Sequence, residues 1–267
     1  MIPFPRERRT FLCEVLDKRR INHEIFRLDI AWPGPPPRAG QFFLVRPEHT
    51  GCFLSRPLSA ALWEPDRAVI RFMIALRGKG TAELAGLGCG GRAELTGPLG
   101  NAWTDLLPAE KGGGATALVG GGIGIAPLLA LALELRDAGA GFDFYAGFKT
   151  LTSNPNDREY GELFGPLFPG EIILATEDGS RGNTGRIPSF LDPGTYRTVC
   201  ACGPEPMLKA VTDVCAAAAV PCFISLERRM ACGAGACLGC TVRTTRGNRR
   251  CCADGPVFPA AEILFDE

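Results

Sequence analysis

Short apolar-rich runs recur through the first hundred positions of the chain. Residues 24–30 alternate clearly between apolar and polar side chains. Further strand candidates occupy residues 11–16, 41–45 and 68–75. Proline and glycine interrupt the chain between these runs, most densely at 33–37, and short runs bounded by such breaks are typical of β-strands. Residues 81–84 favour the start of a short helix. The pattern predicts a small β-barrel domain, which we place at residues 1–105.

The hydrophobic pattern changes beyond residue 114. Residues 115–119 are a short apolar run, a glycine-rich loop follows, and leucines recur at helical spacing along residues 128–135. Further strands are predicted at 143–147, 171–176 and 197–202, and a helix at 205–219. Strands that alternate with helices are typical of a parallel sheet. We therefore predict a nucleotide-binding α/β domain over residues 106–222, joined to the barrel by a polar linker at 103–114.

The last part of the chain, residues 223–267, contains an array of cysteines. Cys232, Cys237 and Cys240 have the C-x4-C-x2-C spacing of plant-type [2Fe–2S] sites, in which a distant fourth cysteine completes the cluster. The glycines between them let backbone N–H groups approach the cluster sulfurs. Zinc sites prefer two C-x2-C hooks, often with histidine, and no histidine follows His49. A glycine-rich loop with free thiols is the plainer alternative.

Two adjacent cysteines, Cys251 and Cys252, compete for the role of fourth ligand. Residues 241–244 alternate like a strand and 246–248 form a turn signal, so we expect the chain to return on a partner strand. Neighbouring side chains of a strand point to opposite faces, so only one of the two sulfurs would face the cluster. The Ala-Asp-Gly-Pro sequence that follows Cys252 favours that residue as the ligand before a turn.

Composition limits the classes of function. The 267 residues carry 29 basic and 29 acidic side chains, so charge gives no indication of a nucleic-acid partner. No apolar run reaches the roughly 20 residues of a membrane span. Residues 1–11 are not followed by the apolar region of a secretory signal. Twelve cysteines without such a signal indicate a reducing compartment, and we expect the cytoplasm.

Two segments of the barrel carry candidate binding chemistry. In the segment at 56–59 (RPLS), arginine offers a planar fork for phosphate, and serine a hydroxyl for the edge of a flavin ring. The glycine-spaced turn at 77–81 opens the short helix, where free N–H groups attract anions. A surface salt bridge at Arg56 and an ordinary hairpin turn at 77–81 are the plainer alternatives.

The glycine loop of the α/β domain joins a strand to a helix N-terminus. Such a loop forms a cradle for a pyrophosphate, although the spacing here is not G-x-G-x-x-G. Ligands of open α/β sheets bind beyond the carboxyl ends of the strands. The candidate nucleotide contacts at these ends are Gly120, Gly121, Gly122, Gly124, Glu177, Asp178, Cys202, Gly203 and Pro204. A solvated turn at Glu177 and a small buried residue at Cys202 are the plainer alternatives.

These segments, in this order, resemble the ferredoxin–NADP reductase superfamily with a C-terminal [2Fe–2S] module. More narrowly, the chain resembles the electron-transfer subunits of NAD-dependent (class 1B) dihydroorotate dehydrogenases, and the resemblance covers essentially its whole length. The loop C-G-x-G-x-C-x-x-C with a later C-x-D-G-P-V-F is its most specific part. Reductase subunits of sulfhydrogenases and sulfite reductases share the first two domains and are the alternative.

The resemblance assigns cofactor contacts to particular residues. The FAD contacts would be Arg56, Pro57, Leu58, Ser59, Met73, Ile74, Ala75, Gly80 and Thr81. Many superfamily members have tyrosine in place of Leu58, so the flavin ring would lack a stacking tyrosine from that position. The cluster ligands would be Cys232, Cys237, Cys240 and Cys252. The turn before Cys252 is short for the family, which leaves Cys251 as an alternative.

The resemblance also implies a function in pyrimidine biosynthesis. Electrons from the FMN of a separate catalytic subunit would pass through the [2Fe–2S] cluster and FAD to NAD+, in a complex with two copies of each subunit. The cofactors supply this chemistry, so we expect no catalytic acid, base or nucleophile among the side chains. Acidic Glu177 and Asp178 beside the ribose favour NAD(H) over NADP(H). An iron–sulfur sensor without turnover and a self-contained NADH reductase are the competing functions.

Overall fold

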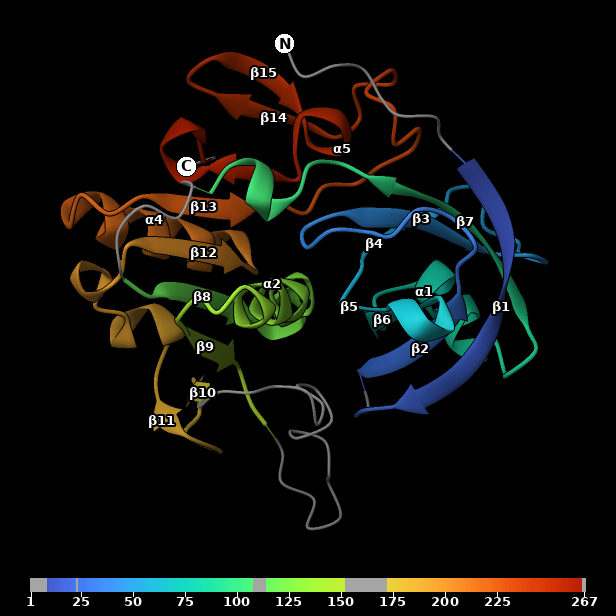
Figure 1. The fold of residues 1–267 in the computed structure, drawn as a ribbon, viewed down its shortest axis with the longest axis horizontal. Helices are drawn as coiled ribbons and strands as arrows, with labels where there is room; N and C mark the ends of the chain where they lie inside the picture. The colour runs from blue at the N-terminus through green and yellow to red at the C-terminus, as the bar shows by residue number, and fades with distance from the viewer. Residues whose placement is uncertain (1–8, 23, 108–113, 152–171, 266–267) are drawn as a thin grey trace.

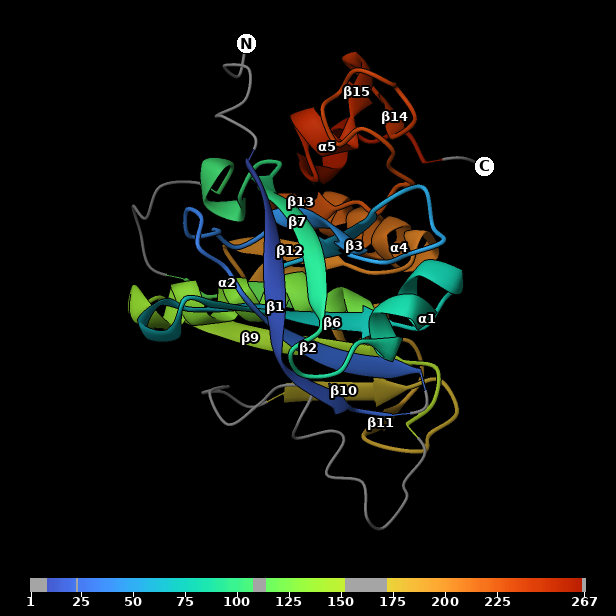
Figure 2. The same cartoon turned by 90° about the vertical axis from the view of Figure 1, so that its right-hand side faces the viewer.

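The computed structural model describes residues 9–22, 24–107, 114–151 and 172–265 (Figure 1). These ranges contain two seven-stranded sheets and a two-stranded hairpin. The two large sheets lie side by side, and the hairpin lies above both of them in two perpendicular views (Figure 1 and Figure 2). No helix within the described ranges is both long and apolar enough to cross a membrane. The mixed β and α/β fold expected from the hydrophobic pattern is confirmed.

The N-terminal sheet is antiparallel and has the strand order β4-β3-β7-β1-β2-β6-β5. Its strands are β1 (Arg9–Arg20), β2 (Ile25–Ala31), β3 (Phe42–Pro47), β4 (Arg56–Ser59), β5 (Leu62–Glu64), β6 (Val69–Ala75) and β7 (Arg92–Leu99). The sheet curls so that β4 also contacts β6, and helix α1 (Lys79–Gly86) contacts β3. Trp32, Phe43 and Phe72 stack edge to face inside it, because the alternating strands turn their apolar side chains inward.

The second sheet has the order β11-β10-β9-β8-β12-β13-β16 and is parallel except for its last strand. Its strands are β8 (Thr116–Gly121), β9 (Phe142–Phe148), β10 (Ile172–Thr176), β11 (Asn183–Thr184), β12 (Thr198–Cys202), β13 (Cys222–Ser225) and β16 (Val257–Pro259). Helix α2 (Ile125–Asp137) packs with Leu118 and Cys200, whereas α4 (Glu205–Ala217) packs with Val199 and Ala201. Because adjacent strand residues face opposite sides, the two helices cover opposite faces of the sheet.

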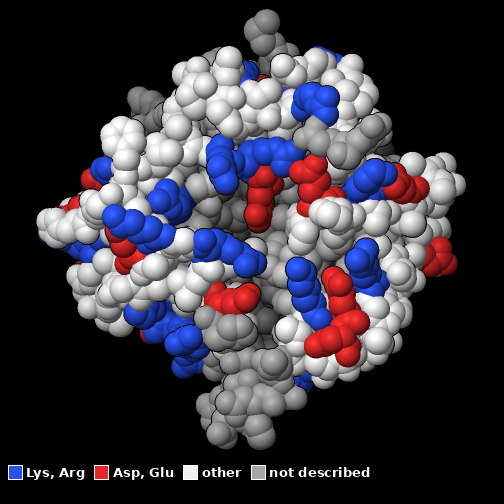
Figure 3. Space-filling model, turned by 180° about the vertical axis from the view of Figure 1, so that it is seen from behind, with Lys and Arg blue, Asp and Glu red and all other residues white. Residues whose placement is uncertain are grey.

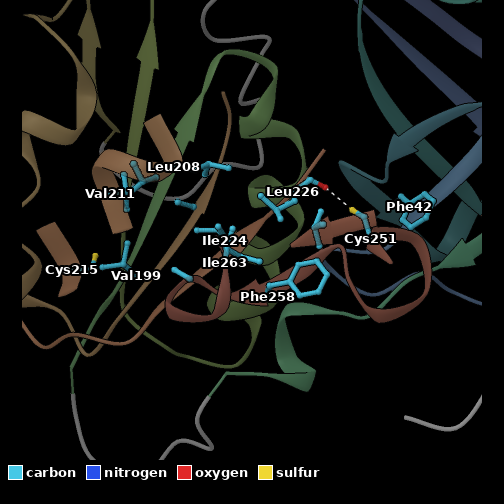
Figure 4. Close-up of a cluster of buried hydrophobic side chains, with 14 of the residues drawn as sticks. Phe42, Val199, Leu208, Val211, Cys215, Ile224, Leu226, Cys251, Phe258 and Ile263 are labelled. Atoms are coloured by element: carbon cyan, nitrogen blue, oxygen red, sulfur yellow. Dashed lines mark hydrogen bonds between the residues drawn. The ribbon is translucent and has the colours of Figure 1, made fainter. Parts of the chain in front are cut away.

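The C-terminal segment packs back onto both sheets. Its elements are β14 (Thr241–Thr244), β15 (Gly247–Arg250), the one-turn helix α5 (Cys251–Asp254) and β16. Strand β16 pairs antiparallel with β13 and so becomes the edge of the parallel sheet. One hydrophobic cluster joins Phe42 of the first sheet, Val199 of the second and Phe258 of this segment (Figure 4). This shared core fixes the cysteine-rich loop relative to the two sheets.

Two local expectations are wrong. Trp103, expected in a linker, is fully buried, because its indole packs in the hydrophobic cluster between the two sheets. Its backbone N–H donates to Ala39 O at 3.0 Å. The centre of that linker, residues 108–113, lies outside the described residues, as does residue 171. Cys252 does not lie on the strand that returns from the hairpin. Strand β15 ends at Arg250, whose N–H donates to Asp254 at 2.7 Å, and this contact closes the helical turn α5.

Candidate functional site

A cavity of about 490 Å³ lies where the barrel, the parallel sheet and the C-terminal segment meet. Basic and acidic side chains gather around a hollow on one face of the molecule (Figure 3). The barrel lines the cavity with eight of the predicted FAD contacts: Arg56, Pro57, Leu58, Ser59, Met73, Ile74, Ala75 and Thr81. The α/β domain contributes Ile123, Ala126, Pro127 and Cys202. The fold thus brings the flavin candidates together with one nucleotide candidate, Cys202, whereas the other nucleotide candidates do not line this cavity.

Strand β4 forms an edge of the barrel sheet beside this cavity. It pairs with β3 in a register that sets Ser59 opposite Phe42 and Arg56 opposite Val45. An edge strand tolerates Pro57, which has no N–H to donate to a further neighbour. The cavity follows β4 from Ser59 to Arg56, a length of roughly 10 Å at the rise of a strand.

The first turn of α1 packs against the guanidinium of Arg56. A Cβ atom at Gly80 would overlap Arg56 Nε, so the guanidinium lies directly against the helix backbone at this glycine. Arg56 Nη1 donates to Leu54 O at 2.7 Å. Thr81 Oγ1 accepts the backbone N–H groups of Arg77 at 2.9 Å and Gly78 at 3.2 Å. A fixed guanidinium beside a helix N-terminus is suited to an anionic phosphate.

The glycine loop after β8 packs closely against the loop that follows β12. Gly120 and Gly121 lie within β8, and a Cβ atom at Gly121 would lie 2.9 Å from the Pro204 ring. A Cβ atom at Gly124 would overlap the carbonyl oxygen of Cys202. Gly122 differs from these glycines, because it has a left-handed φ of +55° and nothing within 4 Å of its Cβ position. Gly122 is therefore the glycine of this loop at which an added side chain would meet no neighbouring atom.

Glu177 and Asp178 follow β10 and do not line the cavity. Both are exposed, and Glu177 Oε2 lies 3.8 Å from Arg186 Nε. Hydrogen bonds from the Ser180 and Thr150 side chains, with the Ser180 N–H, lower the pKa of Asp178 to about 2. The pair therefore presents negative charge beyond the end of β10. The positive charge of nearby Arg186 partly offsets the charge of Glu177.

Backbone N–H groups point at the sulfurs of the cysteine-rich loop. Cys232 Sγ accepts from Ala234 N at 3.2 Å and from Cys237 N at 3.4 Å, and Cys252 Sγ accepts from Gly235 N at 3.1 Å. Gly235 has a φ of +73°, which turns its N–H inward. Burial opposes ionisation of Cys232, but the hydrogen bonds from Cys237 and Ala234 outweigh it and lower the pKa to about 6. Such a loop stabilises thiolates, the form in which cysteine binds metal.

Cys251 and Cys252 are adjacent but face different surroundings. The Cys251 thiol donates to Leu226 O at 3.1 Å and lies with Ile224 and Phe258 in the shared hydrophobic cluster (Figure 4). Its exposed fraction is 0%. Burial raises the pKa of Cys251 well above its usual range. The Cys252 sulfur instead lies beside Cys240 and the Gly235 N–H. The helical geometry of α5 separates the two sulfurs, as the expected strand would have done.

The four candidate ligands form two pairs. Cys232 hydrogen-bonds with Cys237, and Cys252 with Cys240. Within the described ranges no three His, Cys, Asp or Glu side chains converge as ligands of a single metal ion. A [2Fe–2S] cluster needs a different arrangement, because its two irons divide four thiolates between them. Paired thiols beneath inward-pointing N–H groups fit that cluster.

One wall of the cavity was not expected from the sequence. Beside Arg77, which belongs to the turn at 77–81 already considered, it consists of Ser225, Leu226, Glu227, Arg228, Arg229 and Met230. Burial raises the pKa of Glu227, and the charge of Arg77 opposes this. Arg228 Nη1 donates to Glu205 Oε2 at 3.1 Å. All but Arg77 lie at or beyond the carboxyl end of β13, and the apolar run at 222–226 was the signal for that strand.

Comparisons with known proteins agree with this geometry. Residues 227–264 match the family model of the iron-sulfur cluster binding domain of dihydroorotate dehydrogenase B. The chain is 40% identical over 230 residues to the dihydroorotate dehydrogenase B (NAD(+)) electron transfer subunit of Clostridium acetobutylicum, covering 86% of this chain and 87% of that protein. It is also 40% identical over 259 residues to the subunit of the same name from Caldanaerobacter subterraneus subsp. tengcongensis, covering 95% and 98%.

A solved structure supports the fold over nearly the whole chain. It belongs to an NADH-dependent reduced ferredoxin–NADP oxidoreductase studied for flavin-based electron bifurcation. The two chains are 29% identical and superpose with a TM-score of 0.79, covering 95% of this chain and 90% of the other. The match spans the barrel, the parallel sheet and the C-terminal segment together.

Proposed function

Because the chain belongs to the family of dihydroorotate dehydrogenase B (NAD(+)) electron transfer subunits, we propose that it passes electrons from the FMN of a catalytic subunit to NAD+. It is an oxidoreductase subunit that uses FAD, a [2Fe–2S] cluster and NAD(H). The assembly proposed for it contains two copies of each subunit. None of the twelve cysteines, all of which lie in the described ranges, forms a disulfide, which suits a reducing compartment, and we place the complex in the cytoplasm.

The observation that carries this function is the direct contact between the cysteine-rich loop and the flavin cavity. Met230 lines the cavity and precedes Cys232 by two residues. A Cβ atom at Gly233 would lie 2.7 Å from Leu44 of the barrel, so the loop backbone rests on the barrel. A cluster in the loop would therefore lie close to a flavin in the cavity. Such proximity is what electron transfer between two cofactors requires.

When bound, the cluster would supply one-electron transfer, and FAD would supply the combination of two such electrons with a proton into a hydride. The side chains hold and orient these groups. We assign the FAD pyrophosphate to Arg56 and the start of α1, and the ring to the cavity wall of Ser59 and 73–75. We assign the cluster to Cys232, Cys237, Cys240 and Cys252. The proposed domains keep the boundaries 1–105, 106–222 and 223–267, with β13 and β16 joining the last two.

Reconstitution with the catalytic subunit tests the proposed function. The mixture should reduce NAD+ with dihydroorotate as the donor, and mass analysis should give a complex of two copies of each subunit. The chain alone should oxidise NADH with ferricyanide, because that route needs only its own cofactors. If NADH oxidation persists but no complex forms and dihydroorotate reduces no NAD+, the chain serves a different partner.

We also expect a preference for NADH over NADPH. The charges of Glu177 and Asp178 would face the ribose, and the 2′-phosphate of NADPH would be repelled there. We expect kcat/KM for NADH to exceed that for NADPH by about tenfold or more. Glu177→Gln should narrow this ratio without changing the retention of FAD. Equal kcat/KM values for the two nucleotides in the unmodified protein would contradict the assignment.

A further inference from the structure

The most exposed large apolar side chain of the described residues lies next to the proposed FAD site. Phe53 is 91% exposed. It lies in the loop between β3 and β4, which begins after Pro47 and ends at Arg56. An aromatic ring held almost wholly in water leaves its apolar surface available to a flat partner.

Contacts on both sides of Phe53 hold the loop against α1. On one side, the Thr50 hydroxyl donates to Glu83, and Cys52 N donates to Thr50 Oγ1 at 2.9 Å. On the other side, Leu54 O accepts from Arg56 Nη1 at 2.7 Å. The loop is therefore tied to the same helix that begins at the proposed phosphate site, and the Phe53 side chain is exposed to solvent from this loop.

The order of residues along β4 matches the order of groups along FAD. Ser59 lies at the end of β4 proposed for the flavin ring, and Arg56 lies at the end proposed for the pyrophosphate. The adenosine of FAD continues beyond its pyrophosphate. Leu54 and Phe53 precede Arg56 in the chain and lie outside the cavity lining. An adenosine that continued past Arg56 would therefore lie on the same side of this residue as the exposed ring.

We propose that the ring of Phe53 stacks on the adenine base of FAD and so helps the protein to distinguish FAD from FMN. The inference rests on the proposed function, because it requires FAD at Arg56 and Ser59. Stacking of a base on an aromatic side chain changes affinity by about tenfold when the ring is removed. The contact would also cover apolar surface that is otherwise in water.

Flavin titrations of the deflavinated full-length chain test this proposal. Phe53→Ala should raise the Kd for FAD about tenfold and leave the Kd for FMN unchanged, because FMN has no adenine. Phe53→Tyr should restore the affinity for FAD. Arg56→Ala is the matched comparison and should weaken both flavins, because each carries a phosphate. Leu54→Ala should weaken neither, and the melting temperature of Phe53→Ala should stay close to that of the unmodified protein.

Several results would overturn the proposal. An unchanged FAD affinity in Phe53→Ala would exclude the stack, and an equal loss for FAD and FMN would show a general effect of the loop. If FAD affinity is unchanged but binding to the catalytic subunit is lost, Phe53 is a subunit contact. If the unmodified chain binds no FAD at all, the proposed function and this inference both fail. In the other three outcomes only the inference about Phe53 fails.

Discussion

Cys252→Ser should lose most of its iron and the EPR signal of the reduced [2Fe–2S] cluster, whereas Cys251→Ser should keep both. The two substitutions make the same atomic change at adjacent positions, so they form a matched pair. Iron content per chain and the EPR signal after anaerobic purification measure the outcome. Dihydroorotate-dependent reduction of NAD+ should fall with the cluster in Cys252→Ser, while FAD content should remain.

The reason for this difference lies in the surroundings of the two sulfurs. Cys252 Sγ accepts the Gly235 N–H and hydrogen-bonds with Cys240, so removing the thiol removes one of four paired ligands. Cys251 lies in the hydrophobic core and donates to Leu226 O. A serine hydroxyl can donate to the same oxygen, so Cys251→Ser should cost only about 1 kcal/mol of stability.

Cys251→Ala provides a second control, since it removes the hydrogen bond to Leu226 but leaves the cluster ligands in place. It should lower the melting temperature and keep the iron. The ligand assignment is wrong if iron survives in Cys252→Ser and disappears in both Cys251 variants. Loss of iron in all three variants would instead show that α5 must fold correctly before the cluster can bind.

The fold was predictable where short apolar-rich runs stand between proline and glycine breaks. The strands around residues 24–30 and 68–75 each begin within one residue of their expected start, and both are buried along most of their length. Strand β4 was not predicted, because all four of its residues are half-buried and the segment contains proline. Trp103 was misassigned because polar and glycine neighbours surround it, while its burial comes from tertiary contact between the sheets.

The site was predictable where a motif carries its own chemistry. The spacing of the cysteines indicated a [2Fe–2S] cluster directly, whereas the 56–59 segment indicated FAD only together with the family resemblance. The wall formed by Glu227 and Met230 was missed, because short β13 becomes a strand only by pairing with β12 and β16. Likewise, the sequence gives four equivalent glycines at 120–124, and only the packed loops show that Gly122 alone among them has an open Cβ position.

The glycine loop provides a second matched pair, Gly124 and Gly122. Gly124 has a φ of −62°, which alanine adopts without strain. Its added methyl group would nevertheless overlap Cys202 O and lie 2.6 Å from the Cys202 carbonyl carbon. Both are backbone atoms, so no change of rotamer relieves the overlap. The loops cannot separate easily, because β8 and β12 pair in parallel with Gly120 opposite Cys202.

Gly124→Ala should therefore destabilise the protein by about 3 kcal/mol and lower its melting temperature by about 6–12 °C. Gly122→Ala should cost only about 1 kcal/mol, the strain of a left-handed φ, because its methyl group meets no other atom. The same methyl group would project into the space proposed for the nucleotide, so Gly122→Ala should weaken NADH binding more than it lowers stability. Thermal unfolding and NADH titration of both variants measure the contrast. Equal losses of stability in the two variants would show that the loops can separate to accommodate a methyl group at Gly124. Unchanged NADH affinity in Gly122→Ala would show that the nucleotide does not bind at this turn.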